Sequence, residues 1–269
     1  MSVHQRIAIT GASGLIGTAL VGHLKAEGHT VQRLVRRAPV GADEVQWDPQ
    51  TGFVDLEPLR GVDAVIHLAG VGVGDKRWSK KYKSEILNSR LLGTTAIANA
   101  VTELKPQVFI SASAIGWYGE SGNRAVVETD RVGDDFLAAV CREWEAAADL
   151  AQDVRTVKIR TGLVLDPTGG ALGKMLPLFR LGLGGKLGNG KQWWSWITLH
   201  DQLRAIIFAL ENPISGPVNL TAPNPVTNQE FTAALARAMH RPALFPAPAI
   251  ALKIALGGFS SEVLGSKKV

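Results

Sequence analysis

The chain has 269 residues, of which 46% are hydrophobic and 20% charged, as in an ordinary globular protein large enough to bury a substantial core. The net charge of +5 favours acidic ligands, but the 29 Lys and Arg residues are scattered, which argues against a nucleic-acid partner. A single cysteine, Cys141, excludes an intramolecular disulfide, and no His, Cys or carboxylate cluster has the spacing of metal ligands.

Over the first 165 residues, short β-branched runs alternate with longer helical patterns, which is typical of a parallel sheet covered by helices. In chain order, the predicted strands are 6–10, 30–35, 64–68, 107–111 and 156–159, and the predicted helices are 15–27, 80–104 and 135–150. The stretch 39–61 is rich in Pro, Gly and Asp, so we expect no regular element there.

After about residue 165 the pattern changes, because glycines interrupt the chain repeatedly. Trp193, Trp194 and Trp196 lie in a strand pattern at 193–197, and they either pack the core or line a substrate pocket. Helices are expected at 201–210 and 228–239. We predict an α/β fold, with a Rossmann-type doubly wound parallel sheet in residues 1–165 and a smaller C-terminal lobe in residues 166–269 that packs on it. Interleaving of the two parts is left open.

The turn after the first strand carries the glycine pattern TGASGLIG at 10–17, directly before a helix. Glycines in this position let the backbone turn sharply and approach a pyrophosphate, which the positive end of the helix dipole then stabilises. A glycine triplet alone is weak evidence, but its place between two strands of a βαβ unit predicts a nucleotide site. The expected contacts are Gly11, Ser13, Gly14, Leu15, Ile16 and Gly17.

The end of the second strand indicates which dinucleotide is bound. An NAD site usually has Asp or Glu there to bind the ribose hydroxyls, whereas this chain has Arg36 and Arg37. A guanidinium group suits the additional 2′-phosphate of NADP and offers no acceptor to a free hydroxyl. We therefore predict NADP as the cofactor, the alternative being an exposed basic strand end.

Several further segments extend this pattern over essentially the whole chain. Together they resemble the extended and atypical short-chain dehydrogenase/reductases, in particular the epimerase family proteins that are similar to sugar-nucleotide epimerases. The segments are HLAG at 67–70, EILNSR at 85–90, SASAIGWYG at 111–119, WEAAA at 144–148, RTGLVL at 160–165 and GLGG at 182–185. The resemblance implies that Leu68, Ala69 and Gly70 pass beside the cofactor ribose, that Glu85 and Arg90 face the cofactor, and that Val164 closes over its nicotinamide end.

Reductases and epimerases of this superfamily use a Tyr-x-x-x-Lys pair, in which the lysine and the cofactor lower the tyrosine pKa. Here the residues four places after Tyr82 and Tyr118 are Ile86 and Gly122, so the pair is missing. Alignment on the neighbouring motifs places Leu137 and Cys141 at the expected positions, or Phe136 and Val140 if it is shifted by one.

Two weaker catalytic candidates remain, Ser113 and Tyr118. Ser113 matches the superfamily's serine position and either orients a substrate carbonyl or bonds its own backbone, while Tyr118 precedes a glycine as in the superfamily. The pair His200 and Asp201 is better explained as a helix N-cap. The segment GKLGNGKQ at 185–192 nearly fits a phosphate-binding loop but ends in Gln, so we reject phosphate hydrolysis.

We therefore expect an NADP(H)-binding oxidoreductase or epimerase-like enzyme that acts on a small polar substrate such as a sugar or nucleotide sugar. The alternative is a non-catalytic NADP-binding protein that senses redox state or regulates a partner. No signal peptide is recognisable and the apolar stretch 243–259 is too short to span a bilayer, so we expect a cytoplasmic protein without membrane contact. Monomer and homodimer are both compatible with the sequence.

Overall fold

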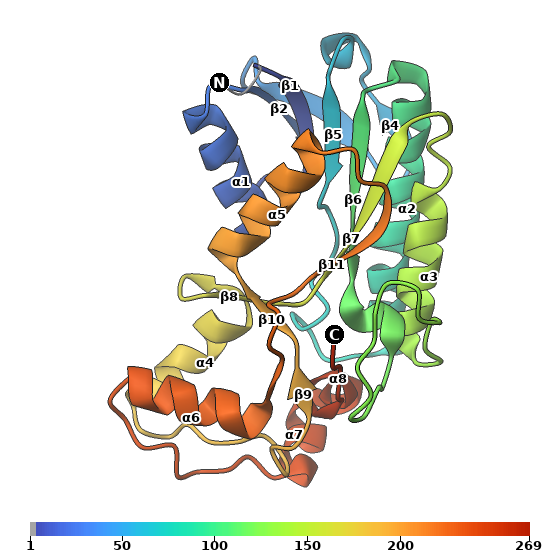
Figure 1. Ribbon diagram of the computed structural model, residues 1–269. Coiled ribbons are helices and arrows are strands. Elements are labelled where there is room, and N and C mark those ends of the chain that lie inside the picture. The colour runs from blue at the N-terminus through green and yellow to red at the C-terminus, as the bar shows by residue number, and fades with distance from the viewer. Residues whose placement is uncertain (1–3) are drawn as a thin grey trace.

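The computed structural model describes residues 4–269, so the first three residues of the expected 1–165 domain lie outside the described part. Its main sheet has the strand order β11 (Gly216–Leu220), β7 (Arg155–Thr161), β6 (Val108–Ala114), β5 (Ala64–His67), β1 (Arg6–Thr10), β2 (Thr30–Val35), β3 (Glu44–Asp48) and β4 (Phe53–Val54). Neighbouring strands are parallel, except that β3 and β4 pair antiparallel at one edge. The predicted Rossmann-type α/β fold is confirmed (Figure 1).

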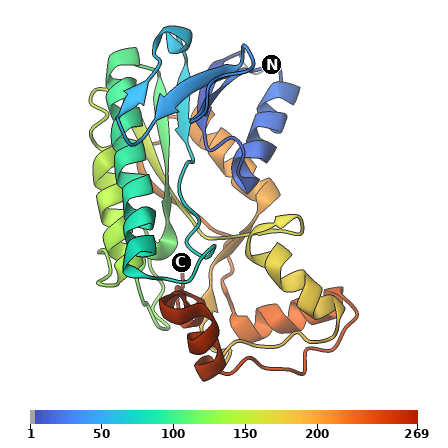
Figure 2. The same cartoon turned by 180° about the vertical axis from the view of Figure 1, so that it is seen from behind.

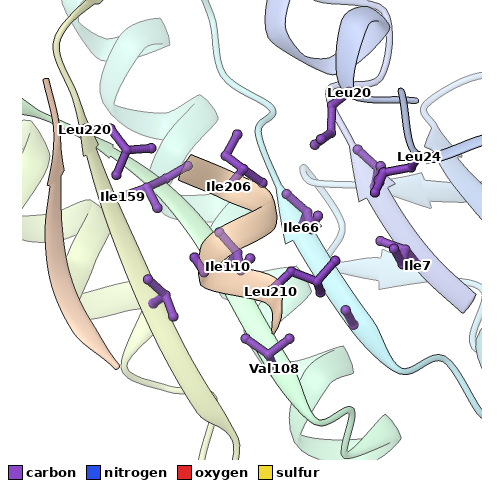
Figure 3. Close-up of a cluster of buried hydrophobic side chains, with 14 of the residues drawn as sticks. Ile7, Leu20, Leu24, Ile66, Val108, Ile110, Ile159, Ile206, Leu210 and Leu220 are labelled. Carbon is purple, nitrogen blue, oxygen red and sulfur yellow. The ribbon is translucent and has the colours of Figure 1, made fainter. Parts of the chain in front are cut away.

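Helices cover both faces of this sheet. α1 (Leu15–Ala26) and α5 (Leu199–Glu211) lie on one face, and α2 (Lys80–Leu104) and α3 (Phe136–Ala148) lie on the other (Figures 1 and 2). Side chains alternate along each strand, so each face has its own core. The core under α1 and α5 is shown in Figure 3 and includes Ile7, Leu20, Ile66, Ile110 and Ile206. The core under α2 and α3 includes Ala8, Val65, Ile97, Phe109 and Ala148.

A second group of elements gathers below the carboxyl ends of the strands in the view of Figure 1. It comprises β8 (Leu163–Asp166), α4 (Gly170–Arg180), β9 (Trp193–Trp194), β10 (Trp196–Thr198), β12 (Val226–Thr227), α6 (Asn228–Ala238), α7 (Ala249–Leu256) and α8 (Ser260–Leu264). The expected strand at 193–197 is divided between β9 and β10 at Ser195. β11 and α5 also follow residue 165, yet they belong to the main sheet layer, because β11 pairs with β7.

The stretch 39–61 differs from its prediction, because it contains β3, β4 and a short 3-10 turn at Glu57–Leu59. Val45 and Trp47 are buried in the core under α2, whereas Gln46 between them is exposed. This alternation spans too few residues to stand out among the surrounding polar residues, and the strand depends on pairing with β2. Within residues 4–269, no helix is both long and apolar enough to cross a membrane.

Candidate functional site

A cleft with a volume of about 1420 Å³ opens where β1, β2 and β5 end. Crevices at the carboxyl ends of parallel strands are where open α/β sheets bind ligands. This one exceeds the roughly 300–1,000 Å³ of common small-molecule pockets, as an extended dinucleotide requires. Its walls include the expected cofactor residues Gly11, Ser13, Gly14, Arg36, Arg37, Leu68, Ala69, Gly70 and Glu85. The other expected residues, Leu15, Ile16, Gly17, Arg90 and Val164, are not among the described residues that line it.

The three glycines of the first turn have different tasks. Gly11 has φ +70°, and a Cβ atom there would lie 2.7 Å from the carbonyl carbon of Leu68. A Cβ atom on Gly17 would lie 2.1 Å from the carbonyl oxygen of Gly11, so Gly17 lets the helix pack on the turn. A Cβ atom on Gly14 would meet only that same oxygen, at 3.4 Å. Gly14 therefore keeps space open on the cleft side, as the approach of a pyrophosphate requires.

The N-terminus of α1 meets this cleft, and no side chain caps it. α2, α3, α5 and α6 are capped by the side chains of Ser79, Asp135, Thr198 and Thr227. α4, α7 and α8 also lack a side-chain cap, but none of their described residues lines the cleft. The first amides of a helix have no partner within the helix, so an uncapped end needs another acceptor. A phosphate group at this position would provide it. The α1 terminus thus fits the diphosphate of a dinucleotide.

Arg36 and Arg37 follow β2 at one end of the cleft and differ in their contacts. Arg37 donates to both carboxylate oxygens of the buried Glu44, at 2.7 and 2.6 Å, and this guanidinium holds the Glu44 pKa down at about 2. Arg33 lies 3.2 Å from the same carboxylate. Arg36 is exposed, and it forms no ion pair or side-chain hydrogen bond with any residue in 4–269. Arg36 is thus the guanidinium that is available to a 2′-phosphate.

The segment 68–70 forms the opposite wall and is backed by Arg90 from α2. Nη1 of Arg90 donates to the carbonyl oxygens of Val71 and Ile86, at 3.0 and 3.1 Å. A Cβ atom on Gly70 would lie 3.4 Å from Cζ of Arg90, so the guanidinium lies directly behind this glycine. Burial lowers the pKa of Arg90. Glu85 lies on the cleft wall, 3.7 Å from the ammonium group of Lys76.

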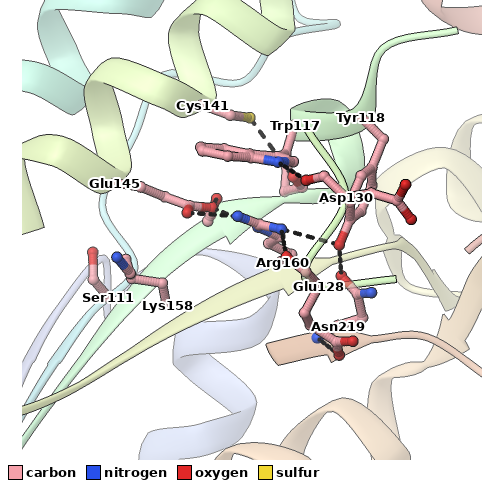
Figure 4. Close-up of polar contacts among 12 residues, drawn as sticks. Ser111, Trp117, Tyr118, Glu128, Asp130, Cys141, Glu145, Lys158, Arg160 and Asn219 are labelled. Carbon is pink, nitrogen blue, oxygen red and sulfur yellow. Dashed lines mark hydrogen bonds and ion pairs between the residues drawn. The ribbon is translucent and has the colours of Figure 1, made fainter. Parts of the chain in front are cut away.

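The two catalytic candidates, Ser113 and Tyr118, are buried and belong to one polar network, of which Figure 4 shows Tyr118, Glu145, Arg160 and Asn219. The Ser113 hydroxyl donates to Glu145 at 2.6 Å, and Arg160 donates to both oxygens of the same carboxylate at 2.8 and 2.9 Å. Arg160 also donates to the Tyr118 hydroxyl at 3.1 Å, and that hydroxyl donates to Asn219 at 2.7 Å.

This network links β6 and the turn after it with α3, β7 and β11, and an aromatic ring packs against it. The Arg160 guanidinium carbon lies 4.0 Å from the ring centre of Trp117, a cation–π contact. Burial raises the Tyr118 pKa above its usual value, so this hydroxyl keeps its proton at neutral pH. Ser113 and Tyr118 are brought together by Arg160, and neither is among the described residues that line the cleft.

The positions that the resemblance assigns to the missing Tyr and Lys are apolar and closely packed. Leu137 packs against a buried cluster of Tyr82, Ile86 and Val140. Cys141 is buried with its thiol 3.7 Å from the carbonyl oxygen of Ala114, and burial raises its pKa to about 12. A thiol with this pKa is protonated and unreactive near neutral pH.

Glu44 and Trp47 are among the residues of the cleft wall that were not predicted from the sequence. Both lie on β3, in the stretch where no element was expected. The only signal was the short apolar alternation around Gln46. Val164 lies on β8, which pairs with β10, and its side chain packs against the core under α1 and α5.

Comparison with known proteins gives consistent relatives. The model of a family described as "NAD dependent epimerase/dehydratase family" matches residues 7–221. Epimerase family protein Mb2239 of Mycobacterium bovis is 47% identical over 261 residues, which cover 96% of this chain and 87% of that protein.

Two solved structures are also similar to this chain. Human epimerase family protein SDR39U1 (isoform 2), crystallised with NADPH, superposes with a TM-score of 0.90 at 35% identity, covering 98% of this chain and 90% of that one. A nucleoside-diphosphate sugar epimerase from Corynebacterium glutamicum has a TM-score of 0.76 at 38% identity, covering 94% and 55%.

Proposed function

Because the chain belongs to the NAD dependent epimerase/dehydratase family, we propose that it binds NADP(H) in the cleft and is an oxidoreductase or epimerase-like enzyme. One observation carries the cofactor assignment. The cleft combines the uncapped N-terminus of α1 with Arg36, which has no ion pair within residues 4–269. The residues that follow β2, 36–41, include no Asp or Glu that could bind a ribose hydroxyl. The human relative crystallised with NADPH supports the same choice.

Each wall of the cleft has a part in holding the dinucleotide. Gly14 and the first amides of α1 bind the diphosphate, and Arg36 binds the 2′-phosphate of the adenosine half. Glu44 accepts two hydrogen bonds from Arg37 and so fixes this side chain beside Arg36. Arg37 therefore shapes the cleft wall and adds positive charge there, but both terminal nitrogens of its guanidinium already donate to Glu44. Residues 68–70 lie beside the cofactor ribose, Glu85 faces the cofactor from the cleft wall, and Arg90 supports this wall from behind Gly70. Val164, which packs on the core, would have to be reached by the nicotinamide end.

The cofactor supplies or takes the hydride, so the protein has to bind and orient a substrate and handle one proton. Ser113 and Tyr118 are the proposed groups that orient a small polar substrate such as a sugar or nucleotide sugar, and to reach it their hydroxyls would have to exchange their bonds to Glu145 and Asn219 for bonds to the substrate. With Arg160 donating to its oxygen, Tyr118 can serve as a hydrogen-bond donor that keeps its proton. A water molecule or a substrate group would then provide the acid that the missing dyad does not.

A second candidate function is non-catalytic sensing of NADP(H). It is favoured by the packing of Leu137 and Cys141, because these positions hold an apolar side chain and a protonated thiol instead of an acid and a base. A sensor would bind the same cofactor at the same cleft but would not turn over. A screen of sugars and nucleotide sugars separates the two functions if it follows both NADPH absorbance, for net oxidation or reduction, and the configuration of the recovered sugar, for epimerisation that leaves the cofactor unchanged.

Calorimetry with NADPH and NADH tests the cofactor assignment. NADPH should bind at least about tenfold more tightly, since a charge-assisted hydrogen bond to phosphate contributes roughly 1.5–3 kcal/mol and 1.4 kcal/mol is tenfold. Arg36→Ala should remove most of this difference. Arg142→Ala is the matched control, because Arg142 is exposed on α3 and pairs only with Glu143. Equal affinities for the two cofactors would refute the assignment.

A further inference from the structure

His67 is a fully buried polar residue next to the cleft, and neither the motifs nor the relatives assign it a task. We propose that His67 is a positioning residue for the dinucleotide: as a neutral imidazole it joins Thr10 on β1 to Thr94 on α2 and so holds two walls of the cleft together. The inference rests on the proposed NADP(H) binding. Nδ1 of His67 lies 2.7 Å from the Thr10 hydroxyl, and Nε2 lies 3.0 Å from the Thr94 hydroxyl.

The directions of the hydrogen bonds from Thr10 through His67 to Thr94 follow from counting donors and acceptors. The Thr10 hydroxyl oxygen accepts from the amides of Leu68 and Ala69, at 3.1 and 3.3 Å. The Leu68 amide is also 3.3 Å from the Thr10 carbonyl oxygen, so its bond is shared between the two oxygens. With both amides on the lone pairs of the hydroxyl, we assign the hydroxyl proton to Nδ1 of His67, its remaining partner. A neutral imidazole then carries its own proton on Nε2 and donates it to Thr94. Every polar atom of the ring is satisfied in this one tautomer.

Burial supports the neutral state. His67 has no exposed surface, and burial together with the positive charge of Arg90 lowers its pKa to about 3. A proton on Nδ1 would also face the hydroxyl proton of Thr10, which has no other acceptor in this arrangement. The ring therefore keeps the same hydrogen bonds over the neutral pH range.

The position of this chain of bonds connects it to the cofactor. Thr10 directly precedes Gly11, whose backbone touches Leu68, and Leu68 and Ala69 are the amides that Thr10 holds. The distance between the glycine turn and the 68–70 wall is thus set by the Thr10 hydroxyl, and His67 fixes the orientation of that hydroxyl. The opposite ring edge is enclosed by Gly93 and by Trp47, whose ring centre is 6.0 Å away and which itself lines the cleft.

Two variants at position 67 separate hydrogen bonding from packing. His67→Leu fills the site but removes both hydrogen bonds, whereas the amide of His67→Gln can accept from Thr10 and donate to Thr94. NADPH dissociation constants are measured by calorimetry on folded protein, together with unfolding temperatures. We expect His67→Leu to weaken NADPH binding by about tenfold and His67→Gln to stay within about threefold of the unaltered chain.

Thr94→Val tests the far end of the chain of bonds, and Thr102→Val is its matched control. Thr102 lies on the same helix, but its hydroxyl bonds to Ala98 and Leu150, away from the cleft. Thr94→Val should weaken NADPH binding by about threefold or more, whereas Thr102→Val should lower only the unfolding temperature.

The outcomes distinguish this inference from the proposed function. If the unaltered chain does not bind NADPH, both fail. If it binds, and His67→Leu and Thr94→Val bind equally well despite a lower unfolding temperature, His67 only stabilises the fold and the inference alone is refuted. Should His67→Leu not fold, unchanged binding by Thr94→Val would refute it as well.

Discussion

The buried, neutral state of His67 predicts a specific loss of stability in acid. In the folded chain burial lowers the pKa of His67 to about 3, from 6.5 for an exposed histidine. Below pH 6.5 His67 is protonated in the unfolded chain but stays neutral in the folded chain. The free energy of unfolding therefore falls as the pH drops from 6.5 towards 3. Each pH unit in this range costs about 1.4 kcal/mol, which amounts to about 3 kcal/mol between pH 6.5 and pH 4.5.

Urea unfolding of the unaltered chain and of His67→Gln, at pH 7 and pH 4.5, isolates this contribution. Every other titrating group is common to both proteins, so the extra loss of about 3 kcal/mol in the unaltered chain belongs to His67. Arginine partners lower the pKa values of Glu44 and Asp43, so these carboxylates also stabilise the fold less in acid. This loss is the same in both proteins. Parallel losses in the two proteins would show that the folded chain protonates His67 as readily as the unfolded chain does, and would refute its lowered pKa.

The central strands and helices could be predicted from the sequence because each is marked by the pattern of apolar residues within its own short segment. β1, β5 and β6 at the centre of the sheet are short, mostly apolar runs that are largely buried on both faces, and the helices packed on them have apolar sides. The glycine turn is local in part, since Gly17 meets the carbonyl oxygen of Gly11 within the turn, whereas Gly11 itself meets Leu68, which is distant in the sequence. The stretch around β3 and the strand β11 were missed, because their strand conformation depends on pairing with distant segments.

The partners of the predicted site residues could not be predicted for the same reason. Arg36 and Arg37 look equivalent in the sequence, but the fold brings Glu44 to Arg37 and leaves Arg36 exposed. Ser113 meets Glu145 across 32 positions, and Tyr118 meets Asn219 across 101. Such contacts exist only after the strands have found their order in the sheet, so a motif can locate a residue near a site without stating what occupies its hydrogen bonds.

Two further predictions concern the glycine turn and the buried ion pair. Gly14→Ala should leave the fold intact, since its Cβ atom meets only one atom at 3.4 Å, but should weaken NADPH binding by about tenfold or more in calorimetry. Gly22→Ala on the same helix, with nothing within 4 Å, is its control and should bind normally while gaining up to about 1 kcal/mol in stability. Arg160→Met should lower the free energy of unfolding by about 3–5 kcal/mol, because it leaves the buried Glu145 carboxylate without its cation. Ser113→Ala removes only one donor from that carboxylate, which keeps both bonds from Arg160, so it should cost no more than about 1–2 kcal/mol. Denaturant unfolding of both variants measures the difference, and equal losses would mean that Arg160 and Glu145 do not form the pair on which Ser113 and Tyr118 depend.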